Sequence, residues 1–475
     1  MLEDFALAPF MTVLDGIEHD FLSEAESFAL LGSKERGSRR VHSGVLRWTE
    51  HAVQHYLTAF PPGNPDLNGE YWQPVRSSWT YEQELSKPDR RGVRSYRIRV
   101  WGRCYRSADG RVNELRMMSY RRDGRKRATE EVAIAAHIAA NAQSRPERVR
   151  VREFTCLDGE TELLYEGTPE QVGELYREFG APALAEVVDG SEYRPGEPCV
   201  KCLYRVECPG LPSAPGVLGI SDRSRPRRTW SVTNGRNYRA CPAKDFLRRM
   251  RLPLDQRIER VAAAERGRAL HDHLLRKHAA DSRTPCAARA EEHWSPRPLP
   301  PDEAEAGAAM LRHHSEVCPL LRLPPGAVLK AEPGLVFDDT DADVVLLVTP
   351  DLLYQDRGSW VWREVKTTRG AAGKAFRTLE SVPQIALAIV LLGRGLLGGS
   401  RARSRVELEV LRPDGVDLRL FDPFDRRMRA EAAEVVHGLV RDWHRDDEFT
   451  PRPSSECRSC EVRRWCPAAL PETAG

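Results

Sequence analysis

Two acidic residues and a lysine interrupt an apolar, β-branched and aromatic stretch in the second half of the chain. The stretch VTPDLLYQDRGSWVWREVKTT, residues 348–368, contains Asp351, Glu364 and Lys366. A two-residue turn at Arg357–Gly358 predicts a β-hairpin in which Asp351 lies directly opposite Glu364, with Cβ atoms about 5 Å apart. Lys366 follows Glu364 by two residues and therefore shares its face of the strand.

Two carboxylates at this distance repel each other unless a cation lies between them. A hard divalent ion, Mg²⁺ or Mn²⁺, is the best match to carboxylate and water ligands. A neighbouring ammonium can orient an attacking water and stabilise charge on a phosphate. The alternative is a cross-strand salt bridge on a solvated face, but the flanking VVLLV and WVW sequences favour strands covered on at least one side.

The elements around this hairpin occur twice along the chain. Each half ends in C-x2-C-x5-C-P, at Cys199, Cys202 and Cys208 and again at Cys457, Cys460 and Cys466. Upstream of each cysteine set, the pattern is a strand, a DG turn, a second strand and a polar helix, which indicates a duplication. We expect an α/β fold with mixed sheets flanked by helices, divided into residues 1–208, a Pro/Gly/Ser/Arg-rich linker at 209–230, and residues 231–475.

Composition excludes several classes of protein. The 475 residues carry a net charge of +2, which gives no overall attraction to nucleic acid. An uninterrupted run of about eighteen apolar residues is absent, and the acidic N-terminus does not suit a signal peptide, so we expect a cytoplasmic protein without a membrane span. In a reducing compartment, cysteines at tight spacing are more often metal ligands than disulfides.

The hairpin residues resemble the signature of PD-(D/E)xK nucleases, with Pro350-Asp351 followed by Glu364-Val365-Lys366. GRALHDHLL is similar to the helix of RecB-like nucleases whose histidine, here His271, is a metal ligand. SVPQIALAIVLL is similar to the following QxxxY helix, with Gln384 in place and Ala388 at the tyrosine position. The resemblance implies a restriction-endonuclease-like core in which Gln384 orients the lysine or a DNA phosphate.

The segment SVTNGRNYRACPAKDFLRR resembles the start of RecB-like domains that carry an iron–sulfur cluster, as in CRISPR-adaptation and AddB-type nucleases. It implies a [4Fe–4S] cluster held by Cys241, Cys457, Cys460 and Cys466, with structural zinc as the alternative.

The other cysteines are less well defined. Cys199, Cys202 and Cys208 form a possible second metal site, with Cys104 or Cys156 as a fourth ligand, or a vestigial one. Cys286 and Cys318 fit no such spacing and are expected to be buried thiols.

The first half resembles a degenerate copy of the second. Aligning the two hairpins places Cys104, Met117 and Ser119 where the second half has its aspartate, glutamate and lysine, and none of these three can hold Mg²⁺. Residues 91–127 contain thirteen basic residues and three acids, so this half is either a DNA-gripping domain or an architectural module with a solvated basic face. The residues we expect to contact DNA are Arg121, Arg122, Arg125, Lys126 and Arg127.

Together these features predict a Mg²⁺- or Mn²⁺-dependent deoxyribonuclease, exonuclease rather than endonuclease, that acts on single-stranded or frayed DNA ends in repair, recombination or defence. Because the chain contains no P-loop, strand separation would require a helicase or another complex subunit. The alternative is a non-catalytic DNA-binding or scaffold subunit of such a complex. Glu332 is either a further acidic site residue or a charge at a sheet edge.

Overall fold

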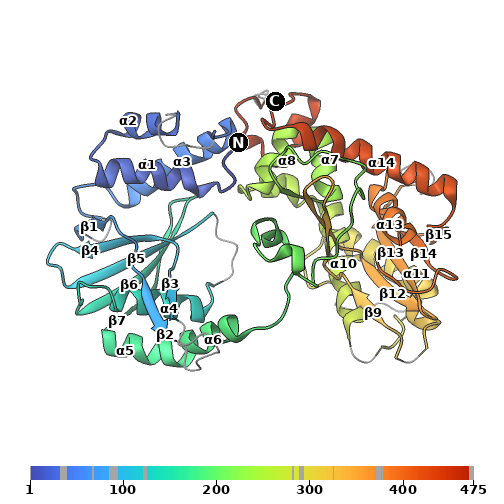
Figure 1. The fold of residues 1–475 in the computed structure, drawn as a ribbon, viewed down its shortest axis with the longest axis horizontal. Helices are drawn as coiled ribbons and strands as arrows, with labels where there is room; N and C mark the ends of the chain where they lie inside the picture. The colour runs from blue at the N-terminus through green and yellow to red at the C-terminus, as the bar shows by residue number, and fades with distance from the viewer. Residues whose placement is uncertain are drawn as a thin grey trace. The chain divides into compact units, whose positions relative to one another are not determined.

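The computed structural model describes residues 2–32, 40–66, 69–84, 95–120, 126–280, 283–287, 294–324, 326–370, 376 and 378–469 (Figure 1). The described chain divides into two compact units. Unit 1 comprises Met1–Glu192, Phe246–Leu254 and Val462–Gly475, and unit 2 comprises Tyr193–Asp245 and Asp255–Glu461. Among the described helices, none has the length and apolar character needed to cross a membrane.

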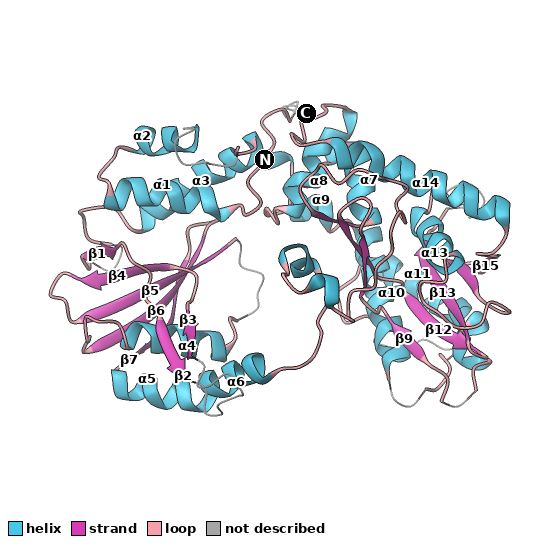
Figure 2. Cartoon of the chain, viewed as in Figure 1, coloured by secondary structure: helices cyan, strands magenta, loops and turns pink. Residues whose placement is uncertain are grey.

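Unit 1 is built on a five-stranded mixed sheet with helices beside it (Figure 2). The strand order is β1-β4-β5-β6-β7, with β1 Trp72–Val75, β4 Arg103–Ser107, β5 Val112–Ser119, β6 Arg148–Thr155 and β7 Thr161–Gly167. A separate ribbon pairs β2 Tyr81–Glu84 with β3 Ser95–Ile98. The helices are α1 Leu7–His19, α2 Glu24–Ala29, α3 Ser43–Ala59, α4 Thr129–Ala140, α5 Pro169–Leu175 and α6 Ala181–Asp189, with a π-helical turn at Tyr176–Gly180.

Unit 2 contains a second five-stranded sheet and a smaller three-stranded one. The larger sheet has the order β9-β12-β13-β14-β15, with β9 Leu329–Ala331, β12 Leu352–Asp356, β13 Ser359–Thr367, β14 Arg405–Arg412 and β15 Gly415–Phe421. The smaller sheet joins β8 Arg228–Trp230, β10 Leu335–Asp339 and β11 Val344–Val348. The helices are α7 Val232–Ala240, α9 Gln256–Glu259, α10 Ala262–Ala279, α11 Pro301–Val317, α13 Pro383–Gly393 and α14 Arg426–Arg445; α8 Pro242–Arg249 has residues in both units.

The two five-stranded sheets have the same topology. In each, successive neighbours pair antiparallel, antiparallel, parallel and antiparallel, and the parallel pair is β5·β6 in unit 1 and β13·β14 in unit 2. A helix connects the parallel strands in both, α4 in the first and α13 in the second. This repeated order supports the duplication inferred from the sequence.

Helices cover the larger sheet of unit 2 on both faces. Val365 on β13 and Leu411 on β14 pack with Leu270 of α10 and Met310 of α11. Side chains alternate along a strand, so the neighbouring positions on β13 point to the opposite face. Because α10 and α11 occupy the Val365 face, α13, which packs on β13 and β14, covers the face of Glu364.

The Pro/Gly-rich segment predicted as a linker is packed onto unit 2. Leu211 lies in an apolar cluster with Val336 and Val345 of the small sheet. The buried carboxylate of Asp339 accepts hydrogen bonds from the backbone N–H groups of Gly216 (2.7 Å) and Leu218 (2.8 Å). Composition indicates the turns in this segment, but its scattered apolar side chains add enough buried surface to hold it against the sheet.

Candidate active site

The hairpin that carries the acidic pair has the register expected from its turn. Leu352 pairs with Arg363 and Asp356 with Ser359, so the two-residue turn is Arg357–Gly358. Both turn residues have positive φ, 51° and 80°, as a type I′ turn requires. Asp351 precedes β12 directly, and continuing this register places it opposite Glu364.

Asp351 and Glu364 converge on one ammonium group. Lys366 Nζ lies 3.0 Å from a carboxylate oxygen of Glu364 and 3.5 Å from one of Asp351. The other Glu364 oxygen accepts a hydrogen bond from the indole of Trp362 (3.0 Å), and Asp351 accepts one from the backbone N–H of Val365 (2.6 Å). These contacts hold the three charged side chains together at the end of β13.

Two residues from other elements complete an ion-binding arrangement. His271, in the middle of α10, lies 3.3 Å from Asp351 through Nδ1. Glu332 follows β9, and its backbone N–H donates to the Asp351 carbonyl (3.2 Å). Three ligand atoms, one each from His271, Glu332 and Asp351, all lie within 4.8 Å of one another. An imidazole and two carboxylates are a donor set that suits Mn²⁺ or Mg²⁺.

The backbone at Glu332 is strained. Its φ of 44° is in the left-handed region, where a side chain with a Cβ is unfavourable. Such conformations are retained where the surrounding structure requires them, often at functional sites. Here the conformation brings the Glu332 carboxylate to His271 and Asp351.

Charge and burial set the protonation of the acidic pair. Burial raises the pKa of Asp351, but Lys366, His271 and the Val365 N–H together lower it to about 2. For Glu364, burial dominates: although Lys366 opposes the change, burial and the Asp351 charge raise the pKa to about 7. One carboxylate is therefore ionised throughout the physiological range, and the other titrates within it.

Both basic groups have raised pKa values. Burial lowers the pKa of Lys366, but the Glu364 and Asp351 carboxylates raise it above its ordinary value. Burial also lowers the pKa of His271, and the hydrogen bond and charge of Asp351 more than offset this. Lys366 is therefore a hydrogen-bond donor and positive charge in this arrangement, not a proton acceptor.

Gln384 lies in the first turn of α13, the helix on the Glu364 face of the sheet. Its side-chain oxygen is buried and has no hydrogen-bond partner among the described residues. A buried amide oxygen without a partner is unfavourable in a purely structural role. Ala388, one helical turn later, is wholly buried in this apolar helix.

In unit 1 the matching face of the sheet is an apolar core. Cys104 and Met117 pack with Leu115 and with Ala135 and Ile138 of α4. Because α4 corresponds to α13, this is the face that carries Glu364 and Lys366 in unit 2.

The alignment of the unit 1 hairpin requires one correction. Cys104 pairs with Leu115 and not with Met117, because the turn is at Asp109–Gly110. The DG sequence favours a tight two-residue turn and so fixes the register. Ser119, the third aligned residue, lies at the end of β5 within hydrogen-bond distance (3.4 Å) of Thr155.

The predicted DNA-contacting residues are only partly described. Arg121, Arg122 and Arg125 lie outside the described residues. Lys126 is exposed. Arg127 is half-buried and paired with Glu131 (3.1 Å) and Glu153 (2.5 Å), so its charge is already matched within unit 1.

The two cysteine sets have the same local structure. Each begins with a 3₁₀ turn, Glu197–Lys201 and Ser455–Ser459, and continues with a second, Arg205–Glu207 and Arg463–Trp465. In both, a backbone N–H donates to the first cysteine sulfur, from Gly196 to Cys199 (3.3 Å) and from Ser454 to Cys457 (3.4 Å).

Within unit 2, Cys241 lies beside the C-terminal segment. The Arg452 N–H donates to the Cys241 sulfur (3.3 Å), and Lys244 pairs with Glu461 (3.0 Å). N–H donors to sulfur stabilise the thiolates that an iron–sulfur cluster requires.

The other thiols have different surroundings. Cys199 and Cys208 pack against Leu211 and Val345 in unit 2. Cys104 and Cys156 are buried in unit 1, and burial raises the pKa of both thiols, to about 11 for Cys104.

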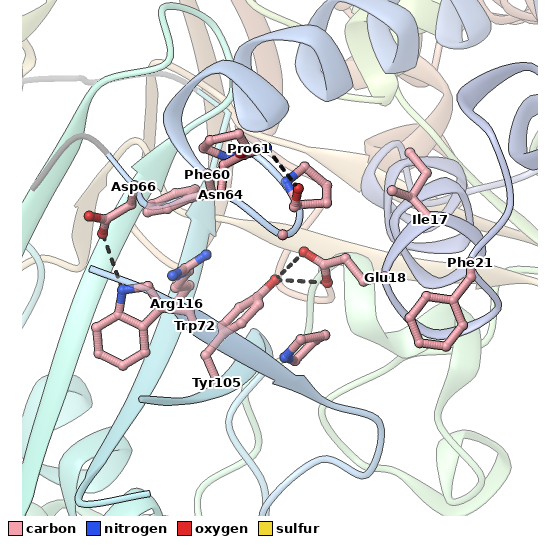
Figure 3. A pocket seen from close by; sticks show the side chains of 13 residues that line it. Ile17, Glu18, Phe21, Phe60, Pro61, Asn64, Asp66, Trp72, Tyr105 and Arg116 are labelled. Atoms are coloured by element: carbon pink, nitrogen blue, oxygen red, sulfur yellow. Dashed lines mark hydrogen bonds between the residues drawn. The ribbon is translucent and has the colours of Figure 1, made fainter. Parts of the chain in front are cut away.

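Unit 1 also contains a cavity of about 340 Å³ on the opposite face of its sheet (Figure 3). Its walls include Phe60, Trp72, Tyr105, Glu18 and Arg116. The Arg116 guanidinium lies 3.7 Å from the Phe60 ring and 3.8 Å from the Tyr105 ring, and the Tyr105 hydroxyl donates to Glu18 (2.8 Å). The Tyr105 hydroxyl and the Glu18 carboxylate thus pair with each other, whereas the Arg116 guanidinium stacks on aromatic walls and has one terminal nitrogen without a hydrogen-bond partner among the described residues.

Two features of unit 2 could not be defined from the sequence. The sequence could not decide whether Glu332 is a site residue or a charge at a sheet edge. A single acidic residue after a short strand has no partner at a characteristic spacing. Cys286 and Cys318 were expected to be buried thiols; Cys318 is buried and Cys286 is half-buried, and both lie beside His278 and His314, a grouping that was not foreseen from the sequence. The H-x3-C spacing at His314 and Cys318 on one helix face was the available signal.

Comparison with known proteins identifies a family for the second half of the chain. The family model of the PD-(D/E)XK nuclease superfamily matches residues 229–467, half of the 475-residue chain. No match was found among curated proteins. Among solved structures, one titled "Crystal structure of SSO0001" is 20% identical, with a TM-score of 0.21, over 30% of this chain and 62% of that one. The matched segment contains Asp351, Glu364, Lys366 and His271 at the positions just described, and the chain belongs to the PD-(D/E)XK nuclease superfamily.

Proposed function

We propose that this protein is a Mg²⁺- or Mn²⁺-dependent deoxyribonuclease whose active site is in unit 2. The observation that carries the proposal is the convergence of His271, Glu332 and Asp351 within 4.8 Å, next to the Lys366–Glu364 pair. An oxygen-rich donor set with one imidazole beside a protonated lysine suits hydrolysis of a phosphodiester and has no evident purpose in a scaffold.

Each residue of the proposed site has a distinct role in hydrolysis. His271, Glu332, Asp351 and Glu364 would hold the divalent ion, which when bound supplies an activated water and charge neutralisation at the phosphate. Lys366, held protonated, would donate a hydrogen bond to the attacking water or to a phosphate oxygen. Gln384 would use its unpartnered amide to position Lys366 or the DNA backbone.

The test uses purified full-length protein, Mn²⁺ and end-labelled single-stranded DNA. We expect cleavage that EDTA abolishes and that Asp351→Asn or Lys366→Met eliminates. Asp356→Asn is a matched control, because Asp356 is on the same hairpin but pairs with Arg405 at its far end (3.0 Å). Folded protein that binds DNA without cleaving it, across Mg²⁺ and Mn²⁺, would instead support a scaffold subunit.

A second substrate would separate exonuclease from endonuclease action. We propose an exonuclease on single-stranded or frayed ends, working in the cytoplasm in repair, recombination or defence with a helicase partner. Circular single-stranded DNA should then resist cleavage while linear DNA of the same sequence is degraded. Equal cleavage of both would assign an endonuclease.

We also propose that Cys241, Cys457, Cys460 and Cys466 hold a [4Fe–4S] cluster. The backbone N–H donors to the Cys241 and Cys457 sulfurs support it, as does the position of Cys241 beside the C-terminal segment within unit 2. Anaerobically purified protein should be brown and contain about four iron atoms per chain. Colourless, iron-free protein with zinc would favour the zinc alternative.

For unit 1 we propose a DNA-gripping role without catalysis. Its sheet has the nuclease topology but an apolar core where the catalytic face would be, and Lys126 is its described candidate for a phosphate contact. Lys126→Glu should weaken DNA binding at low salt without changing the cleavage rate at saturating DNA, since phosphate contacts contribute mainly through counterion release.

A further inference from the structure

Four metal-ligating side chains meet in unit 2, apart from the candidate active site. His278 is in the last turn of α10, Cys286 is in the segment that follows, and His314 and Cys318 are at the end of α11 and just beyond it. One ligand atom from each lies within 4.8 Å of all the others. His278, His314 and Cys318 are buried and Cys286 is half-buried.

Two sulfur–nitrogen separations in this group match those of a tetrahedral zinc site. The Cys286 sulfur lies 3.5 Å from His278 Nε2, and the Cys318 sulfur lies 3.7 Å from the same atom. With Zn–S bonds of about 2.3 Å and Zn–N bonds of about 2.0 Å, a tetrahedron has sulfur–nitrogen edges of about 3.5 Å. The ligands therefore need little movement to coordinate an ion.

His314 is oriented for this role by a carboxylate. Its Nδ1 lies 2.6 Å from Glu409 on β14, and the other Glu409 oxygen accepts a hydrogen bond from Arg363 (2.9 Å). Its Nε2 is buried and has no hydrogen-bond partner among the described residues. A histidine that donates one ring N–H to a carboxylate and presents the other nitrogen is the usual arrangement around zinc.

A bound ion gives the buried His314 nitrogen the partner that it otherwise lacks in the described part of the chain. Thiols are weak hydrogen-bond donors and cannot fully compensate two buried imidazoles. A Cys286–Cys318 disulfide would remove even those donors. Because an ion satisfies all four groups together, we propose that His278, Cys286, His314 and Cys318 hold a zinc ion in a Cys2His2 site.

Four protein ligands leave no open position, so the site is structural. The bound ion would connect the end of α10 to the end of α11. Through Glu409 on β14, it would also connect both helices to the five-stranded sheet of unit 2. His271 is seven residues before His278, about 10 Å along the same helix. The site therefore fixes the helix that presents His271 to the candidate active site.

The ion has a route to the site. A cavity of about 620 Å³ has Val317, Cys318 and Arg363 among its lining residues. It therefore reaches the cluster at Cys318.

The first experiment compares metal content in full-length protein. Zinc and iron are counted by mass spectrometry in the wild type, in Cys286→Ser/Cys318→Ser, and in Ala136→Ser, which introduces a hydroxyl into the apolar core of unit 1. We expect the double variant to lose about one zinc per chain, with iron unchanged, and the control to match the wild type. Zinc content equal in all three proteins would overturn the site.

The second experiment keeps all four ligands, so it does not depend on whether the double variant folds. Glu409→Gln removes the carboxylate behind His314 and should weaken zinc binding about 10- to 100-fold in competition with a chelator. Glu407→Gln is the matched control, because Glu407 is on the same strand and also pairs with Arg363 (2.6 Å), but its other contacts are with Tyr354 and Arg405. Equal zinc retention by both variants would show that Glu409 supports no metal ligand.

Discussion

Metal binding at the candidate active site should depend on pH through Glu364. Its pKa is raised to about 7, chiefly by burial, whereas Asp351 has a pKa of about 2 and is ionised at every pH of interest. In the proposed site the divalent ion is held by the ionised Glu364 carboxylate together with Asp351, so ion binding must displace a proton when the pH is below 7. Affinity should therefore fall as the pH falls.

The magnitude follows from the pKa. For a group with a pKa of 7, the protonated fraction rises from about one-tenth at pH 8 to about nine-tenths at pH 6. The apparent affinity for Mn²⁺ then drops about tenfold, or about 1.4 kcal/mol. His271, whose pKa is also raised, adds a further loss in the same direction, while Asp351 adds none.

Calorimetric titration with Mn²⁺ in the absence of DNA measures this effect. The His271→Gln substitution removes the imidazole contribution. The tenfold change in apparent Mn²⁺ affinity expected between pH 8 and pH 6 in that variant is therefore due to Glu364. Buffers of different ionisation enthalpy should report release of about half a proton at pH 7. Adding Glu364→Gln should abolish both the proton release and the pH dependence.

Two results would refute the reasoning. If the His271→Gln variant binds Mn²⁺ equally well at pH 6 and pH 8, then either Glu364 is not a metal ligand or its pKa is not raised. If Glu364→Gln in the same background leaves the proton release unchanged, another group titrates. The Asp356→Asn protein should behave as the wild type in both measurements.

Three further predictions concern stability. Lys366→Met leaves two carboxylates without their shared cation, so EDTA-treated protein should lose about 3 kcal/mol of unfolding free energy in urea denaturation, and Mn²⁺ should restore part of it. Glu332→Gly relieves the positive φ and should stabilise the EDTA-treated protein by about 1 kcal/mol while weakening Mn²⁺ binding; unchanged affinity would exclude Glu332 as a ligand. Met117→Glu buries a carboxylate in an apolar core, so it should destabilise unit 1 by more than about 3 kcal/mol in hydrogen exchange and create no Mn²⁺ site.

The hairpin and its acidic pair could be predicted because the interactions that define them are local. Positive φ at both turn residues, the alternation of strand side chains and the two-residue loop fix the register within a few residues of Arg357–Gly358. The same physics explains the one-step error in unit 1, where the Asp109–Gly110 turn moves Cys104 opposite Leu115. The duplicated sheet order could be inferred because both copies have the same order of turns, strands and helices.

The remaining features depend on contacts between segments distant in sequence. Glu332 becomes a site residue because β9 pairs with β12 and its backbone N–H meets the Asp351 carbonyl. The segment at 209–230 packs on unit 2 because Asp339, more than a hundred residues later, accepts its backbone N–H groups. Neither contact could be predicted from the sequence, because many other short strands or turns could have made the same contact.

The histidine–cysteine group shows why spacing alone misses such sites. His278 to Cys286 and His314 to Cys318 are ordinary intervals taken separately, and they become one site only because α10 and α11 pack side by side, as in the ion pair of Arg266 with Glu303. The carboxylate that orients His314 comes from a third element, β14, which is parallel to the strand that carries Glu364. If the proposed zinc ion is bound, the helix of His271 is held at two points, by Asp351 at its middle and by the ion at its last turn. Removing that ion should then lower Mn²⁺ affinity at the active site without altering any residue in it.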